Sequence, residues 1–197
     1  EISACLVGSE MCIRDSLKKA LRYKGYWGSK GGITVSGGEP LLQMDFLTEF
    51  FKKAKAEGVH TNLDTSGNPF TDQEPWHSGW LELMKYTDLV MLDIKQIDEQ
   101  EHIKLTGHSN KNILAMAREL SDMKKPVWIR HVLVPDGSDK DEYLHRLADF
   151  IHTLSNVERV EVLPYHTLGK FKWENLGLSY PLELSLIHIS EPTRQAE

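Results

Sequence analysis

Short runs of β-branched and apolar residues alternate along this chain with segments in which apolar residues recur every three or four positions. The short runs predict strands, and the wider spacing predicts helices with one apolar face. The predicted strands are 33–35, 59–63, 89–92, 127–134 and 160–163. The predicted helices are 17–26, 41–57, 76–86, 98–105, 111–123 and 138–154. This alternation predicts an α/β protein with a parallel sheet and right-handed crossovers.

Several residues refine the predicted helix starts and the predicted buried faces. Leu42 falls in the apolar stripe of the second helix, and Asn110 stands where a side chain caps a helix. Ser138 or Asp139 begins the last helix. The strand 89–92 is apolar at every position, which indicates that both of its faces are covered. A (β/α) barrel, a partial barrel and a doubly wound sheet all fit this pattern.

Composition narrows the class of protein. The chain has 197 residues, of which 40% are hydrophobic, and a net charge of −6. This charge argues against a nucleic-acid or anionic-membrane partner, although a local basic patch is compatible with it. The sequence has no apolar run long enough to span a bilayer and no signal peptide, so we expect a cytoplasmic protein. Its two cysteines provide no disulfide framework.

The two ends of the chain differ in character from its middle. Residues 1–16 and 184–197 resemble translated sequencing-adapter DNA, and neither end continues the strand–helix alternation. We therefore expect both to be non-native extensions of a domain at 17–183. The first residue is not Met, so we also expect an internal fragment of a longer protein.

The turn after the first predicted strand carries the most specific pattern. Gly37, Gly38 and Glu39 follow the strand 33–35 directly. Glycines without a Cβ allow a ligand to approach backbone N–H and C=O groups, and Glu39 adds a charge that could hold an ammonium group. An ordinary strand-to-helix turn with a solvated glutamate has the same sequence pattern.

Other polar residues also follow predicted strands. They are Asp64, Thr65, Asp93, Lys95, Arg130 and His166. Taken singly, each also fits an Asx turn, a solvated lysine, an ion pair or simple packing. Parallel strands bring their carboxyl ends to one rim, where α/β proteins bind ligands. A rim that mixes acids and bases suits a zwitterion such as an amino acid.

Five stretches at these strand ends match a known family in order. They are Thr-Val-Ser-Gly-Gly-Glu at 34–39, Leu-Asp-Thr-Ser-Gly at 63–67, Leu-Val-Met-Leu-Asp-Ile-Lys at 89–95, Val-Trp-Ile-Arg at 127–130 and Leu-Pro-Tyr-His at 163–166. The chain resembles the radical S-adenosylmethionine (SAM) enzymes that activate glycyl-radical enzymes. The resemblance implies a partial (β/α) barrel of the radical SAM type, without its N-terminal strand and cluster loop.

The resemblance also implies a reaction and its cofactors. A reduced [4Fe–4S] cluster cleaves S-adenosylmethionine, and the resulting 5′-deoxyadenosyl radical takes a hydrogen atom from a glycine of the partner. The cofactor-binding residues implied are Gly37, Gly38, Glu39, Asp93, Ile94, Lys95, Arg130 and His166. Those implied for a monovalent cation are Asp64, Thr65, Met91 and Asp93, an oxygen-rich set that suits a hard cation.

The implied partners are a glycyl-radical enzyme and an electron donor such as flavodoxin or ferredoxin. The match around Trp128 and Trp173 points to pyruvate formate-lyase, and other glycyl-radical enzymes are the alternative.

The cysteines depart from the family pattern. The family holds its cluster with Cys-x3-Cys-x2-Cys, whereas this chain has only Cys5 and Cys12. We therefore identify no catalytic residue and expect the chain as written to be inactive. Two further hypotheses stay open: a cluster-free barrel enzyme with Lys95 as a Schiff-base nucleophile, and a non-catalytic fragment.

Overall fold

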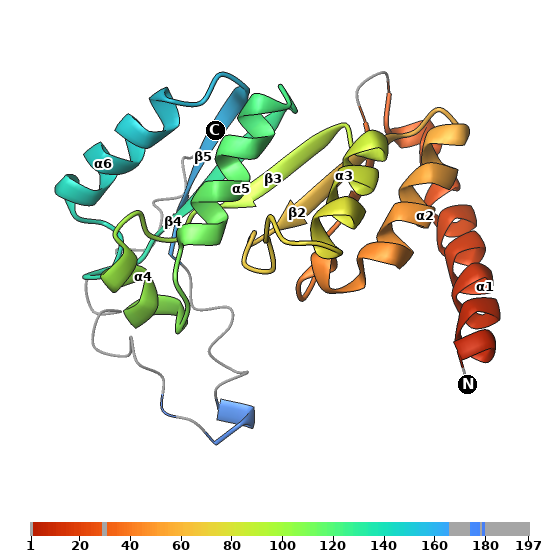
Figure 1. The fold of residues 1–197 in the computed structure, drawn as a ribbon, viewed down its shortest axis with the longest axis horizontal. Helices are drawn as coiled ribbons and strands as arrows, with labels where there is room; N and C mark the ends of the chain where they lie inside the picture. The colour runs from red at the N-terminus through yellow and green to blue at the C-terminus, as the bar shows by residue number, and fades with distance from the viewer. Residues whose placement is uncertain (1, 29–30, 166–173, 178, 180–197) are drawn as a thin grey trace, which may run out of the picture.

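The computed structural model describes residues 2–28, 31–165, 174–177 and 179, with side chains from residue 12 onward. Five parallel strands form one sheet (Figure 1): β1 (Gly32–Val35), β2 (His60–Thr65), β3 (Leu89–Asp93), β4 (Val127–Leu133) and β5 (Val157–Pro164). Their order in the sheet is β1-β2-β3-β4-β5. A doubly wound sheet would reverse direction at a switch point, so this sequential order identifies a partial barrel.

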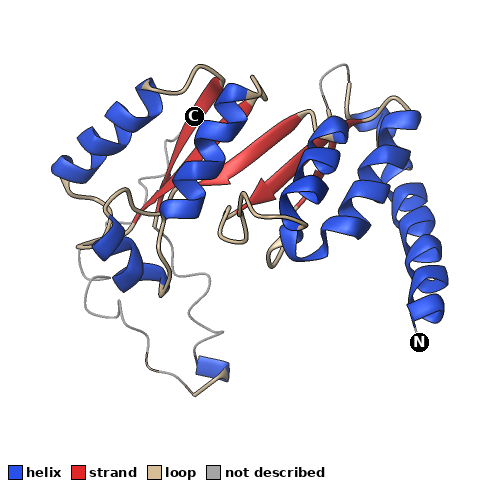
Figure 2. Cartoon of the chain, viewed as in Figure 1, coloured by secondary structure: helices blue, strands red, loops and turns tan. Residues whose placement is uncertain are grey.

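Helices connect successive strands and lie along one face of the sheet (Figure 2). They are α1 (Ile2–Leu21), α2 (Met44–Ala56), α3 (Trp76–Tyr86), α4 (Glu99–Thr106), α5 (Lys111–Asp122) and α6 (Asp141–His152). Two short 3-10 helices, η1 (Lys24–Tyr26) and η2 (Pro40–Gln43), precede β1 and α2. The six helices and five strands predicted from the periodicity are therefore confirmed, with shifted boundaries.

The hydrophobic core lies between the sheet and these helices. The outward side chains of the strands, such as Leu63, Val90 and Ile129, are fully buried against helix residues such as Phe51 and Trp80. Helix α1 packs on α2 and buries Ile13 and Leu17 in the same core, although part of it lies in the range 1–16. In the described parts of the chain, no helix has the length and hydrophobicity needed to cross a membrane.

The inner face of the sheet is more polar than its outer face. Because side chains alternate along a strand, Val90 and Leu92 point into the core, whereas Met91 between them is only half-buried. Met91 lines a hollow of about 610 Å³ with Asn62 and Trp128. The prediction that both faces of this strand are covered is therefore wrong for the inner face.

The second predicted helix begins differently from the expectation. Pro40 opens the 3-10 helix η2, and the α-helix starts only at Met44. A 3-10 helix has three residues per turn, so the apolar stripe shifts by one position. Leu41 is consequently 2% exposed, whereas Leu42, which we placed in the stripe, is 75% exposed.

Two predicted helix-start residues have other roles. The side chain of Asn110 does not cap α5; its amide donates to the carbonyl oxygens of Gln96 and Ile97. The buried hydroxyl of Ser138 donates to Val132 O and accepts from Val134 N, and α6 begins at Asp141. Both side chains satisfy loop backbone groups that the short turns would otherwise leave unpaired.

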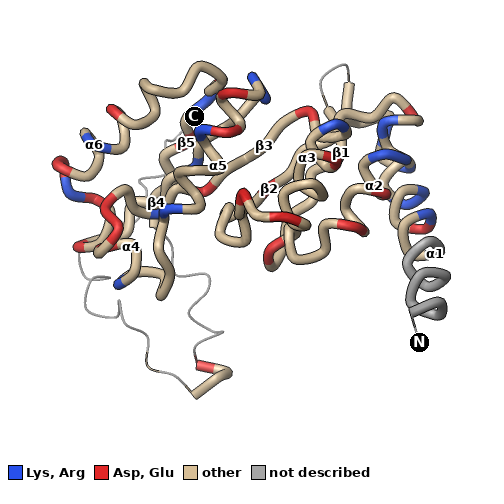
Figure 3. Tube along the Cα trace, in the orientation of Figure 1, with Lys and Arg blue, Asp and Glu red and all other residues tan. Residues whose placement is uncertain are grey.

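Basic positions gather along α1 and the end of α2 (Figure 3). They include Lys18 and Lys19 in the last turn of α1 and Lys53 and Lys55 in the last turn of α2. Cations there complement the negative end of the helix dipole. This explains a local basic region on a chain whose net charge is −6.

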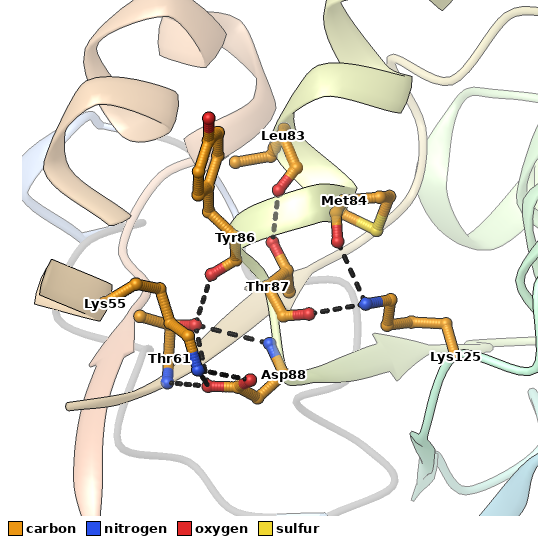
Figure 4. Close-up of polar contacts among 8 residues, drawn as sticks. All are labelled: Lys55, Thr61, Leu83, Met84, Tyr86, Thr87, Asp88 and Lys125. Atoms are coloured by element: carbon orange, nitrogen blue, oxygen red, sulfur yellow. Dashed lines mark hydrogen bonds and ion pairs between the residues drawn. The ribbon is translucent and has the colours of Figure 1, made fainter. Parts of the chain in front are cut away.

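Lys55 reaches a polar network at the amino ends of β2 and β3 (Figure 4). Its ammonium lies 2.7 and 2.8 Å from the two carboxylate oxygens of Asp88, which also accepts from the backbone N–H of Thr61. Burial alone would raise the pKa of Asp88, but these hydrogen bonds and the Lys55 charge bring the pKa below its usual value. Nearby, Lys125 donates to the carbonyl oxygens of Met84 and Thr87 at the end of α3.

Replacing Leu41 by Ala is expected to lower the free energy of unfolding by about 2–5 kcal/mol, because it removes buried methyl groups and leaves a cavity. The matched variant Leu42→Ala is expected to change it by less than about 0.5 kcal/mol, because Leu42 is exposed. Urea denaturation of both variants measures the difference. Equal losses would contradict the observed start of α2.

Asp88→Asn is expected to lower the free energy of unfolding by about 1 kcal/mol at neutral pH. The folded-state pKa of Asp88 lies below its unfolded value, so the carboxylate's contribution is complete above about pH 4 and is lost as the pH falls through the folded pKa. The difference between wild type and variant should therefore shrink in acid. Urea denaturation across pH measures it, with Asp149→Asn as an exposed control.

Candidate functional site

The turn after β1 leaves its backbone open. Gly37 and Gly38 have φ angles of 92° and 56°, in the left-handed region that favours glycine. A Cβ added at either position would meet no atom within 4 Å. The turn therefore favours glycine for its conformation, and the space beside both glycines is free of other atoms. The predicted contact of this backbone with a ligand stays a prediction.

Glu39 fastens this turn to the end of β2. Its Oε1 accepts hydrogen bonds from Leu41 N at 3.1 Å and Thr65 Oγ1 at 2.6 Å. Its Oε2 accepts from the backbone N–H and the hydroxyl of Ser66, at 2.9 and 2.6 Å. A carboxylate has about four acceptor positions, so these contacts use its capacity within the chain. The predicted contact of Glu39 with a ligand ammonium group stays a prediction.

Arg130 and Asp64 form an ion pair on the inner face of the sheet. The Nη1 atom of Arg130 lies 2.9 Å from both carboxylate oxygens of Asp64. Its Nε lies 3.9 Å from Glu161 Oε2 and makes no hydrogen bond within the described residues. The guanidinium therefore keeps a buried N–H group without a hydrogen-bond partner among the described residues, and its predicted contact with a cofactor stays a prediction.

Asp93 lies beside Arg130 in the register of β3 and β4. Burial raises the pKa of the Asp93 carboxyl, and the nearby carboxylates of Asp64 and Glu39 add to this effect. The charges of Lys95 and Arg130 act in the opposite direction. A carboxyl group in this setting accepts hydrogen bonds readily from a ligand that brings donors into the site.

The two residues after Asp93 face opposite ways. The side chain of Ile94 is fully buried in the core. Its backbone N–H donates to Arg130 O at 2.9 Å, and its carbonyl oxygen lies 2.7 Å from His131 Nδ1, so the predicted contact of Ile94 with a cofactor stays a prediction. Lys95 is exposed and lines a pocket together with Asp93. A Schiff-base lysine is activated by desolvation or a cationic neighbour, and the exposure of Lys95 gives it no desolvation. The predicted site residue His166 lies outside the described residues.

Three of the four residues expected to hold a monovalent cation are engaged with the chain. Asp64 pairs with Arg130, and Thr65 donates to Glu39. The sulfur of Met91 accepts from the amide of Asn62 at 2.9 Å. Among the residues that the structure describes, no group of three or more His, Cys, Asp and Glu side chains is placed to hold a metal ion.

The cysteines do not fit a [4Fe–4S] cluster. Both Cys5 and Cys12 lie in α1, and Cys12 is an exposed free thiol. A cluster of this family needs three thiolates, so two cysteines seven positions apart cannot supply the set. A nucleoside cofactor fits better, because the rim combines an open glycine turn with a pocket of mixed donors and acceptors.

Sequence reasoning missed one side of this pocket. Its lining comprises the predicted residues Asp93 and Lys95 together with Ser66, Asn68, His102, Thr106, His108 and Ile113. The signal for His102 was available: it lies seven positions after Lys95, in the helix that directly follows the rim turn. Its burial and contacts depend on the fold of the loop after α4, which periodicity does not describe.

Comparison with known families and proteins is consistent with this geometry. The family model of the Radical SAM superfamily matches residues 8–149. A pyruvate formate-lyase-activating enzyme of Streptococcus mutans is 55% identical over 175 residues, which are 89% of this chain and 66% of the relative. One from Staphylococcus epidermidis is 55% identical over 88% of this chain and 70% of its own length. The chain thus spans about two thirds of the length of these relatives.

A solved structure extends the comparison. The crystal structure of a domain of pyruvate-formate lyase-activating enzyme from Bacteroides vulgatus is similar to this chain with a TM-score of 0.61 and 28% sequence identity. The similarity covers 68% of this chain and 81% of that domain. With the sequential parallel sheet, the open glycine turn and the rim residues in place, these comparisons show that the chain belongs to the radical SAM superfamily, whose enzymes use S-adenosylmethionine and a [4Fe–4S] cluster.

Proposed function

We propose that the protein to which this chain belongs activates pyruvate formate-lyase by generating a glycyl radical on it. The observation that carries this proposal is the 55% identity to pyruvate formate-lyase-activating enzymes over 89% of the chain. That span includes β1 to β4 and the rim residues at their ends. A match of this length points to the same reaction more strongly than the shared fold does.

In this proposal the chain supplies most of the S-adenosylmethionine site. The open backbone at Gly37 and Gly38 receives the methionine part, and Glu39 holds the turn in place. Asp93 and Lys95 line the site with Ile94 between them, and Arg130 binds toward the carboxylate. By its resemblance to the family, His166 is assigned to the same end of the cofactor. Once bound and reduced by one electron, S-adenosylmethionine supplies the radical that removes a hydrogen atom from the partner's glycine.

The cluster ligands are assigned to a part of the protein beyond this chain. The matched segment leaves about one third of the length of these relatives uncovered. We propose that a Cys-x3-Cys-x2-Cys segment stands before Leu17 in the intact protein. The 197-residue chain by itself then binds the cofactor without cleaving it.

The proposal has three finer parts. Pyruvate formate-lyase is the partner, and flavodoxin or ferredoxin donates the electron. A monovalent cation binds between the side chains of Asp64, Thr65, Met91 and Asp93 once ligand binding rearranges their present contacts. The protein acts in the cytoplasm, as the absence of an apolar run long enough to span a bilayer and of a signal peptide in the given sequence led us to expect.

The first test uses the intact protein with its cysteine segment, expressed and purified without oxygen. Mixed with S-adenosylmethionine, a reductant and pyruvate formate-lyase, it is expected to produce a glycyl-radical signal in electron paramagnetic resonance and equal amounts of methionine and 5′-deoxyadenosine. The 197-residue chain under the same conditions is expected to produce neither.

Different outcomes separate the alternatives. A signal on another glycyl-radical enzyme but not on pyruvate formate-lyase would assign a different partner. An intact protein that lacks the three cysteines, or one that leaves S-adenosylmethionine uncleaved, would refute the proposed reaction.

The cation is tested by thermal unfolding with S-adenosylmethionine present. We expect a higher Tm in sodium or potassium chloride than in tetramethylammonium chloride of equal ionic strength, because only the small cations fit among carboxylate oxygens. The difference should disappear in Asp64→Asn and persist in the exposed control Asp149→Asn. Equal Tm values in all three salts would remove the cation from the proposal.

A further inference from the structure

The turn between β3 and α4 is held by buried polar side chains. Gln96, Asn110 and His131 are 0%, 2% and 2% exposed. Burying a polar group costs free energy unless the group is hydrogen-bonded, so each of these side chains marks a contact that the fold requires. None of them has a role in the function proposed above, although His131 directly follows the rim residue Arg130 in β4.

The ring of His131 lies on the outer face of the sheet. Side chains alternate along a strand, so this ring points away from the inner face where the guanidinium of Arg130 pairs with Asp64. Its Nδ1 lies 2.7 Å from the carbonyl oxygen of Ile94, and its Nε2 lies 3.4 Å from that of Ser138. A carbonyl oxygen only accepts and a neutral imidazole has a single N–H, so the shorter contact assigns the hydrogen to Nδ1.

This hydrogen bond holds the peptide group that leads into Lys95. The carbonyl of Ile94 and the N–H of Lys95 belong to the same planar peptide unit, so fixing one fixes the direction of the other. The N–H of Ile94 itself donates to Arg130 O at 2.9 Å. Strand β4 therefore binds both backbone polar groups of Ile94, one through its own backbone and one through the ring of His131.

Lys95 stands between two fully buried residues. Ile94 and Gln96 are each 0% exposed, whereas Lys95 is exposed at the rim. The side chain of Gln96 donates to Gly137 O at 2.8 Å and accepts from Asp98 N at 3.1 Å. The backbone is thus anchored immediately before and immediately after Lys95, and only the lysine side chain of these three residues faces outward.

The ammonium of Lys95 has no fixed partner of its own. Among the residues that the structure describes, Lys95 takes part in no hydrogen bond or ion pair with another side chain. A lysine carries its charge on a flexible stem, so the region that this charge reaches depends on where the backbone places its Cα and Cβ. The anchors on either side of Lys95 therefore decide where its charge is available.

We propose that His131 is a positioning residue, which directs Lys95 toward the carboxylate of the bound cofactor by fixing the peptide group between Ile94 and Lys95. The inference rests on the proposed use of S-adenosylmethionine. His131 touches no ligand and acts only through Lys95. Without a donor at the position of Nδ1, the Ile94 carbonyl loses its partner, the peptide plane is free to rotate, and the ammonium samples a wider region.

Three substitutions in the 197-residue chain isolate this role. His131→Leu fills a similar apolar volume and donates nothing. His131→Asn keeps an amide donor near the position of Nδ1, from which it restores the hydrogen bond to Ile94 O. Thr61→Val is the matched control, because it removes the buried hydroxyl that donates to Tyr86 O at the amino end of β2, away from the rim.

Isothermal titration calorimetry measures the Kd of S-adenosylmethionine for each variant, with no requirement for cleavage. His131→Leu is expected to raise Kd about five- to tenfold, the effect of weakening one charge-assisted hydrogen bond. Combined with Lys95→Met, the same substitution should change Kd less than about twofold, because the group through which it acts is gone. His131→Asn should return Kd to within about twofold of the wild type.

Urea denaturation separates positioning from stability. His131→Leu and Thr61→Val are both expected to lower the midpoint of unfolding, because each leaves a buried carbonyl oxygen without its donor. Only His131→Leu should change Kd by more than about twofold, since Thr61 lies at the opposite end of the strands.

A further measurement needs no variant and therefore holds even if His131→Leu fails to fold. In nitrogen-15 spectra of the wild-type chain, the His131 ring is expected to carry a hydrogen on Nδ1, coupled to the Ile94 carbonyl. A ring with its hydrogen on Nε2 alone would overturn the inference.

The binding results distinguish this inference from the function on which it rests. An equal rise in Kd in the wild-type and Lys95→Met backgrounds, or an unchanged Kd in His131→Leu, would overturn the role of His131 while S-adenosylmethionine binding stands. A wild-type chain that fails to bind S-adenosylmethionine would overturn both.

Discussion

The hydrogen bonds to the carboxylate of Glu39 are the interaction on which the rim depends. They join the glycine turn after β1 to Thr65 and Ser66 at the end of β2, two segments that are far apart in sequence. The backbone pairing of β2 with β3 brings the ends of these two strands together. In this anchored turn, Gly37 and Gly38 hold left-handed conformations. No other atom lies within 4 Å of the position that a Cβ would take at either glycine. Loss of this anchor would disturb the ligand-facing turn before it disturbed the core.

The two faces of the sheet have different roles: the outer face forms the hydrophobic core, and the inner face carries polar residues of the candidate site. Outward side chains such as Leu63 and Ile129 are buried under the helices and supply the core. Inward side chains such as Asp64 and Arg130 pair with each other on a face that stays half-open. At the amino ends of the strands, the ion pair between Lys55 and Asp88 joins α2 to the start of β3. Neither of these residues belongs to the rim. The same alternation of a pleated strand therefore provides both the core and the site.

Much of the fold was readable from spacing. The five strands and six helices were predicted, because apolar periodicity directly reflects which face of an element is buried. Errors arose where a short polar side chain or a proline changed the local geometry, as at Leu42 beside Pro40 and at Asn110. The rim residues of the first four strands were found from the same pattern, because polar residues that follow apolar strands stand out. His102 was missed because its only signal was its position seven residues after Lys95, and a histidine in a polar helix does not stand out from its neighbours.

The sequence by itself determined the α/β class, the strand ends that carry polar residues and the family to which the motifs belong. These properties depend on local spacing and on residue identity, which are printed in the chain. Apolar spacing left a doubly wound sheet and a partial barrel open, and only the family resemblance implied the barrel. The tertiary structure confirmed the barrel, since strand order depends on which edges pair. It also decided that Glu39 bonds to Thr65 and Ser66, and that His102 is buried with its Nδ1 against His108 O. Hydrogen bonds between distant segments form only after the chain has packed, and periodicity contains no record of them.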